Sequence, residues 1–205
     1  AGTEIYISSA PPEPPAAVNL GGNGKLTITR YDNGEKLSVT YRDKKGEYDK
    51  KALAKINRVM RCSLDDTETE IAVKLVELLD AVEDKFGKKG ITLLSGFRSQ
   101  KLNGTLKGAA EHSLHMLGWA ADIRVQGYSS TKIKNFALKK KAGGVGYYPD
   151  MGFTHLDVGK SRYWVVKRPH KRRAHRRKIS AKAATKAKKS VKSPKPAAKK
   201  TVRKK

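Results

Sequence analysis

The stretch HSLHMLGWAADIRV, residues 112–125, indicates the fold more clearly than any other part of the sequence. It reads as a loop that carries His115 and enters a short strand that carries Asp122. A second stretch, FTHLDVG at residues 153–159, is predicted as another strand and contains His155. Alternate residues of a strand share one face. If the two strands pair, two imidazoles and one carboxylate therefore converge.

The sequence as a whole predicts a mixture of β-strands and α-helices. Apolar alternation and turn residues predict strands at 25–31, 36–41, 91–97, 120–125, 145–148 and 153–158. Helical spacing predicts helices at 50–60, 69–86 and 130–141, the second with apolar residues on one face and acidic residues on the other. A polar loop is expected between the strand at 91–97 and residue 111. This mixed order predicts an α+β fold in which a small antiparallel sheet is flanked by helices.

The charge of the chain is concentrated at its end. The chain has 205 residues and a formal net charge of +26, and residues 160–205 hold 21 of its 45 Lys and Arg and no acidic residue. This leaves 24 basic and 19 acidic residues, a net charge of +5, in residues 1–159. We expect an extended Pro/Ala-rich leader at 1–24, one globular domain at 25–166 and a disordered basic tail at 167–205.

Composition limits the remaining possibilities. Cys62 is the only cysteine, so the chain forms no internal disulfide and no cysteine-based metal cluster. No apolar stretch approaches the roughly 20 residues needed to span a membrane. The sequence starts at Ala1 rather than at Met, which suggests a processed form of an exported protein or a trimmed chain.

Two histidines and a carboxylate with an open fourth position are the ligands of a typical catalytic zinc ion. Such an ion lowers the pKa of its bound water to about 7 and polarises a substrate carbonyl. The plainer interpretation is that the histidines are ordinary core or surface residues and that Asp122 caps a turn. Spacing alone does not decide between the two.

Several further motifs follow one another in a fixed order. Residues 113–122 fit S-x-H-x-x-G-x-A-x-D, and H-x-D follows at 155–157. Upstream, SGFRS at 95–99 with Asn103 resembles S-G-Y-R-S-x-x-x-N, and GGVGYYP at 143–149 resembles a glycine–tyrosine segment. Over residues 25–164, the chain resembles the YcbK-like murein endopeptidases. These are relatives of the D-Ala-D-Ala carboxypeptidases and dipeptidases and of the lysostaphin and hedgehog metal-site folds.

The resemblance implies one Zn²⁺ per chain, held by His115, Asp122 and His155. In the dipeptidase relatives a Glu shortly before the last His acts as general base, but Gly152, Phe153 and Thr154 stand there in this chain. Asp157 is then the candidate base. The alternative is that Asp157 orients His155.

Two more residues are candidates for the active site. Arg98 is expected to anchor an anionic group of the substrate, because a guanidinium pairs well with a carboxylate; the alternative is a structural arginine that bridges loop and core. Ser113 could hydrogen-bond the substrate or a group of the metal site, or it could only fix its loop.

The function expected from these features is hydrolysis of peptide cross-links or stem peptides in peptidoglycan by a monomeric periplasmic or otherwise exported zinc metallopeptidase. The basic tail would hold the enzyme to anionic wall polymers or to a membrane surface through salt-sensitive contacts. Two alternatives remain: a wall-binding module that kept the metal site without catalysis, and a basic protein that binds nucleic acid through its tail.

Overall fold

The computed structural model describes residues 12–87 and 89–168. Contacts divide the chain into two units, residues 1–167 and 168–205, and the fold is that of the first unit. Residues 1–11 of the predicted leader and residues 169–205 of the predicted basic tail lie outside the described residues. Among the described helices, none combines the length and the apolar character that crossing a membrane requires.

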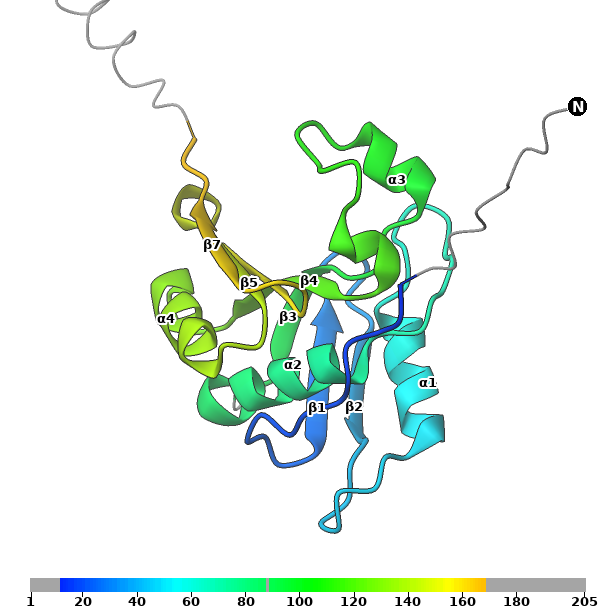
Figure 1. Ribbon diagram of the computed structural model, residues 1–205. Helices are drawn as coiled ribbons and strands as arrows, with labels where there is room; N and C mark the ends of the chain where they lie inside the picture. Colours follow the sequence, from blue (N-terminus) through cyan, green and yellow to red (C-terminus); the bar gives the residue numbers. More distant parts are fainter. Residues whose placement is uncertain (1–11, 88, 169–205) are drawn as a thin grey trace, which may run out of the picture. The chain divides into compact units, whose positions relative to one another are not determined.

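Seven strands form one mixed sheet (Figure 1). They are β1 (Lys25–Arg30), β2 (Lys36–Thr40), β3 (Ile91–Ser95), β4 (Ala120–Val125), β5 (Gly144–Tyr148), β6 (Phe153–Asp157) and β7 (Arg162–Val165). Their order in the sheet is β2-β1-β3-β4-β6-β5-β7. The pairs β1–β3 and β5–β7 are parallel, and all other neighbours are antiparallel. The α+β class is confirmed, and the central strands are antiparallel as expected.

Helices cover one face of this sheet. The helix α2 (Val73–Phe86) packs on β1 and β4, and α4 (Ser130–Lys140) packs on β5 and β6 (Figure 1). The helix α1 (Lys50–Val59) packs on β2. The core between helices and sheet includes Ile123 and Leu156, which are fully buried. Residues that alternate with them on β4 and β6 point to the opposite face, which we call the site face.

Helix α2 begins at Val73, four residues later than the predicted start at 69. The N–H of Ile71 donates to the side chain of Asn57, and the N–H of Ala72 donates to the carbonyl of Gly118. These two groups are therefore bonded to other parts of the fold before the helix starts. The prediction of the start was wrong because apolar spacing does not register such contacts.

Two acidic residues of α2, Glu77 and Asp80, are buried as well. Asp80 is 0% exposed, and its carboxylate accepts hydrogen bonds from the N–H groups of Asn23 and Gly24 and from the hydroxyl of Tyr41. Burial raises the pKa of Asp80, although these hydrogen bonds oppose the shift. The last residues of the predicted leader are thereby fixed to α2.

The segment expected as a polar loop contains the helix α3 (Gln100–Thr105). Ser99 caps this helix, because its hydroxyl accepts the N–H of Leu102 at 3.2 Å. Asn103 donates its side-chain amide to the carbonyl of Ala110 and so ties the following loop back to the helix. A six-residue helix without apolar periodicity gives no sequence signal, which is why it was not predicted.

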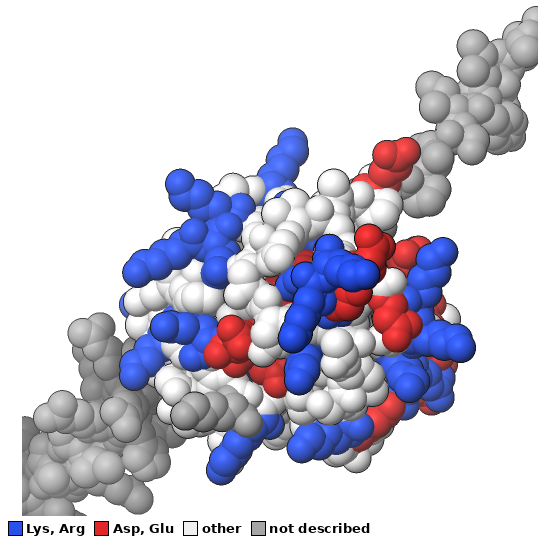
Figure 2. Space-filling view, turned by 90° about the horizontal axis from the view of Figure 1, so that it is seen from below, with Lys and Arg blue, Asp and Glu red and all other residues white. Residues whose placement is uncertain are grey.

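The surface of this unit carries charges of both signs. On the face shown in Figure 2, Lys and Arg side chains are interspersed with Asp and Glu side chains. This matches the modest net charge of residues 1–159. The strongly basic composition of the chain therefore comes mainly from the tail rather than from the folded unit.

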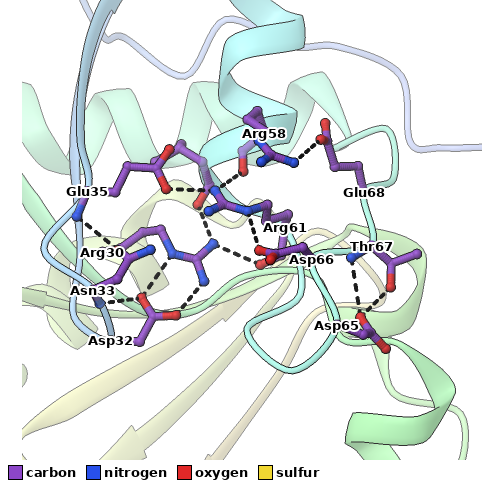
Figure 3. A network of polar contacts seen from close by, with 11 residues as sticks. Arg30, Asp32, Asn33, Glu35, Arg58, Arg61, Asp65, Asp66, Thr67 and Glu68 are labelled. Atoms are coloured by element: carbon purple, nitrogen blue, oxygen red, sulfur yellow. Dashed lines mark hydrogen bonds and ion pairs between the residues drawn. The ribbon is translucent and has the colours of Figure 1, made fainter.

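A network of ion pairs fixes the end of α1 to β1 (Figure 3). Arg30 is only 5% exposed; it pairs with Asp32 and donates to the carbonyls of Val59 and Arg61, each at 3.0 Å. Arg61 in turn pairs with two carboxylates, those of Glu35 and Asp66. In the same segment the carbonyl of Met60 accepts the N–H of Phe97, next to Gly96. The network therefore supports the segment that leads from β3 to the metal-ligand candidates.

We expect Arg30→Met to lower the free energy of unfolding by about 2–4 kcal/mol, because two buried carbonyls would lose their donor. Urea denaturation of the metal-free protein measures this change. The control is Lys36→Met, at an exposed position of β2. A loss for Arg30→Met no larger than that of the control would contradict the structural role.

Candidate metal centre and its surroundings

Strand pairing brings two of the three candidate ligands together. Asp122 on β4 lies opposite His155 on β6, and this row continues to Ser95 on β3 and to Gly146 on β5. All four residues belong to the site face. The register, set between segments far apart in the chain, thus places an imidazole beside a carboxylate.

The third candidate comes from a short turn of helix. His115 lies in the 3-10 helix η1 (Leu114–Leu117), directly before β4, and is 2% exposed. The turn ends at Gly118, which has φ +71 and packs so closely that an added Cβ would lie 2.5 Å from the carbonyl oxygen of Glu70. Only glycine suits this position. The left-handed backbone at Gly118 lets the chain turn sharply between η1, which carries His115, and β4, which carries Asp122.

The donor atoms of these three residues converge. His115 Nε2 lies 3.2 Å from His155 Nδ1, and His155 Nδ1 lies 2.9 Å from Asp122 Oδ1. The second carboxylate oxygen of Asp122 is 3.5 Å from His115 Nε2. The ligand atoms all lie within 4.8 Å of one another, and all three residues are buried. This is a compact N,N,O donor set.

The other ring nitrogens determine which atoms are free to bind an ion. His115 Nδ1 lies 2.7 Å from the carbonyl oxygen of Gly96, which can only accept, so Nδ1 carries the proton. His155 has a carboxylate at each ring nitrogen: Nδ1 lies 2.9 Å from Asp122 Oδ1, and Nε2 lies 3.2 Å from Asp157 Oδ2. In the neutral state, Nε2 of His115 is therefore unprotonated, and so is Nδ1 of His155 when its Nε2 donates to Asp157. Two lone pairs and a carboxylate then face one another, an arrangement that a cation stabilises.

The electrostatics agree with this arrangement. Burial lowers the pKa of His115. Burial acts to raise the pKa of Asp122, but the two neighbouring histidines hold it well below its usual range. Burial also acts on His155, yet hydrogen bonds to Asp122 and Asp157 raise its pKa. Asp122 is therefore ionised, and the residues fit a divalent metal ion.

Asp157 is enclosed by donors. It is 0% exposed; Oδ1 accepts from the N–H groups of Gly144 and Gly159, and Oδ2 accepts from Arg162 at 2.8 Å. Burial acts to raise the pKa of Asp157, but hydrogen bonds from His155 and from the N–H groups of Gly144 and Gly159 lower it. Both oxygens are thus occupied by the chain's own groups.

Arg98 lies at the candidate metal centre. Its guanidinium pairs with Asp122 and donates from Nε to the hydroxyl of Ser95 at 2.8 Å. Its backbone N–H donates to the carbonyl of His115. Arg98 is thus bonded to two of the three candidate ligands.

The loop before η1 contributes less to the centre. Ser113 directly precedes η1, and its carbonyl accepts the N–H of Met116. No described hydrogen bond joins the Ser113 side chain to the candidate ligands. His112, the residue before Ser113, is exposed and lies outside the donor set.

Three residues at the site were given no role in the sequence analysis. Gly96 orients His115 through its carbonyl, Arg162 binds Asp157, and Trp164 lies with its ring centroid 5.1 Å from that of His155. Gly146 makes room for this indole, since an added Cβ would lie 2.6 Å from it. Gly96 lies inside the SGFRS motif, but a carbonyl contact and a ring contact have no signature in the sequence.

Two histidines and one aspartate that converge on one face of a sheet form the kind of ligand set that single-metal hydrolases use. Residues 21–164 match the family model described as "Peptidoglycan L,D-endopeptidase MepK". The chain belongs to this family, Peptidase_M15_2, which is a family of metal-dependent peptidases.

Two relatives illustrate the similarity. The peptidoglycan L,D-endopeptidase MepK of Escherichia coli (strain K12) is 34% identical over 144 residues, which cover 68% of this chain and 79% of that protein. The probable peptidoglycan L,D-endopeptidase MepK of Haemophilus influenzae is 30% identical over 169 residues, which cover 80% of this chain and 90% of that protein. The expected family and the expected class of enzyme are confirmed.

Proposed function

We propose that this protein is a zinc-dependent murein endopeptidase that hydrolyses an L,D peptide bond in the cross-links of peptidoglycan. The observation that carries the proposal is the convergence of three donor atoms whose partners leave their lone pairs directed at one point. The names of the relatives support the substrate and the type of bond.

His115 Nε2, His155 Nδ1 and the carboxylate of Asp122 would hold the zinc ion. When bound, zinc supplies a polarised substrate carbonyl and a water molecule of lowered pKa. The chain's own contribution is to fix the ligands in place. Gly96 and Asp157 select the tautomers of the two histidines, and a fixed tautomer strengthens metal binding.

For Asp157 we propose the orienting role rather than that of general base. Its oxygens already accept from two backbone N–H groups, from Arg162 and from His155. A general base must reach the proton that it removes, directly or through one water molecule. Asp157 is completely buried and already bonded to these donors, so it is better suited to holding His155 in place.

For Arg98 we propose that it holds Asp122 in the orientation of a ligand, which its contact with that carboxylate supports. Anchoring of a substrate anion by Arg98 and a substrate contact from Ser113 stay predictions.

The proposed substrate implies an exported protein that meets the cell wall. Binding of the basic tail to anionic wall polymers or a membrane surface, and a monomeric state, likewise stay predictions. The nucleic-acid alternative rests mainly on the tail, because residues 1–159 carry a net charge of only +5.

Digestion of purified cross-linked peptidoglycan tests this function. The zinc-loaded protein is expected to reduce cross-linked dimers and to release soluble muropeptides, which mass spectrometry identifies. A chelator should stop the release, and added zinc should restore it, because the ligand set is needed for activity. One bound zinc per chain without new products would support the wall-binding module instead.

A further inference from the structure

Three arginines lie on or beside the site face, and two of them are committed to carboxylates. Arg98 pairs with Asp122, and Arg162 pairs with Asp157. The third, Arg124, forms no ion pair with any residue in the described ranges 12–87 and 89–168. A guanidinium so close to a metal centre and without an acidic partner indicates a site for an external anion.

Arg124 is on the same strand and face as Asp122. It lies two residues further along β4, and the core residues Ile123 and Val125 on either side of it point to the helices. Two residues of a strand span roughly 7 Å. An anion bound by Arg124 would thus lie one or two residues of an extended peptide away from the metal centre.

The guanidinium of Arg124 is held in place from two sides. Nη2 donates to the carbonyl of Met151 at 2.7 Å, in the turn between β5 and β6. The guanidinium carbon also lies 5.6 Å from the ring centroid of Tyr31, which is 65% exposed. These contacts use one donor and one face of the group. The remaining N–H donors stay available for a carboxylate.

The neighbouring residues extend this site with an apolar surface. The pairing of β4 with β6 reaches Ile123 and Thr154, and Arg124 and Phe153 are the next residues of these two strands. The ring of Phe153 stacks on that of Tyr148, with centroids 4.2 Å apart. The guanidinium of Arg124 can pair with a carboxylate, and the partly exposed rings of Phe153 and Tyr148 can contact an aliphatic chain. Together they suit a ligand whose aliphatic chain ends in a carboxylate.

We infer that Arg124 binds a carboxylate of the peptide substrate next to the scissile bond and thereby determines specificity for stem peptides that carry this group in its free, unamidated form. The inference rests on the proposed function. It assigns to Arg124 the anion recognition that the sequence analysis expected of Arg98.

The test compares a cross-linked muropeptide dimer with the same dimer after its free carboxyl groups have been converted to amides. Wild-type protein is expected to cleave the free dimer with a kcat/KM about 10-fold or more above that of the amidated dimer, since a hydrogen-bonded charge pair contributes at this level. Arg124→Gln should lose this preference, chiefly through a higher KM for the free dimer. Arg124→Lys should keep part of it, because the charge stays while the planar fork is lost.

The matched control is Lys134→Gln. Lys134 also lies over aromatic rings, those of Tyr147 and Tyr163, but it belongs to α4 on the other face of the sheet. This variant should keep the wild-type preference. Zinc content and thermal unfolding of each variant show whether the metal centre and the fold are intact.

Calorimetric binding of the free and amidated product peptides separates this inference from the proposed function. Tighter binding of the free peptide by wild-type protein, lost in Arg124→Gln, supports the inference even where peptidoglycan is not cleaved. Cleavage of both dimers with a preference that Arg124→Gln leaves unchanged would overturn the inference and leave the endopeptidase function standing. An absence of any preference in the wild-type protein would overturn it as well.

Discussion

The His115→Ala variant is expected to lose stoichiometric zinc and to retain no more than about one thousandth of the wild-type activity. The metal contributes several kcal/mol to the stabilisation of the transition state, and each ~1.4 kcal/mol corresponds to a factor of ten in rate. His115 is 2% exposed and bonded to Gly96, so no neighbouring group takes its place as a ligand. Metal analysis of the purified protein, together with peptidoglycan digestion, measures both effects.

His112→Ala is the matched control for this variant. It removes an exposed histidine from the same loop, three residues away, and should leave the zinc content and the activity unchanged. Thermal unfolding of both metal-free proteins excludes a loss of fold. If His115→Ala bound one zinc ion and cleaved peptidoglycan at the wild-type rate, the proposed ligand set would be wrong.

The second large effect is expected for Asp157→Asn. This change keeps the size of the side chain but removes the carboxylate that accepts from His155 and Arg162. Loss of such an orienting carboxylate lowers metal affinity or activity by about 10- to 100-fold. We therefore expect zinc to dissociate more readily from this variant, which competition with a chromophoric chelator measures, and the activity at saturating zinc to recover in part.

A general base would give a different result. Its removal lowers the rate by about 100- to 10,000-fold, and added metal does not compensate. Wild-type zinc affinity combined with such a loss of rate would therefore assign Asp157 to proton transfer. The two measurements together decide the question that the H-x-D motif left open.

The sequence predicted most of the secondary structure because its signals are local. The turn residues between β1 and β2, the apolar alternation of strands and the apolar spacing of α1 each depend on residues close in the chain. The prediction was wrong where long-range contacts or very short elements are involved. The start of α2 is set by Asn57 and Gly118, and α3 depends on a cap and a loop contact.

The sequence by itself determined the family, the α+β class and the three candidate ligands, because ordered motifs and local periodicity depend only on the order of residues along the chain. Only the tertiary structure decided which nitrogen of each histidine faces the centre, which carboxylate each arginine pairs with, and that Arg124 has no such partner among the described residues. These properties depend on strand register and on the packing of segments far apart in the chain, and neither is encoded by spacing.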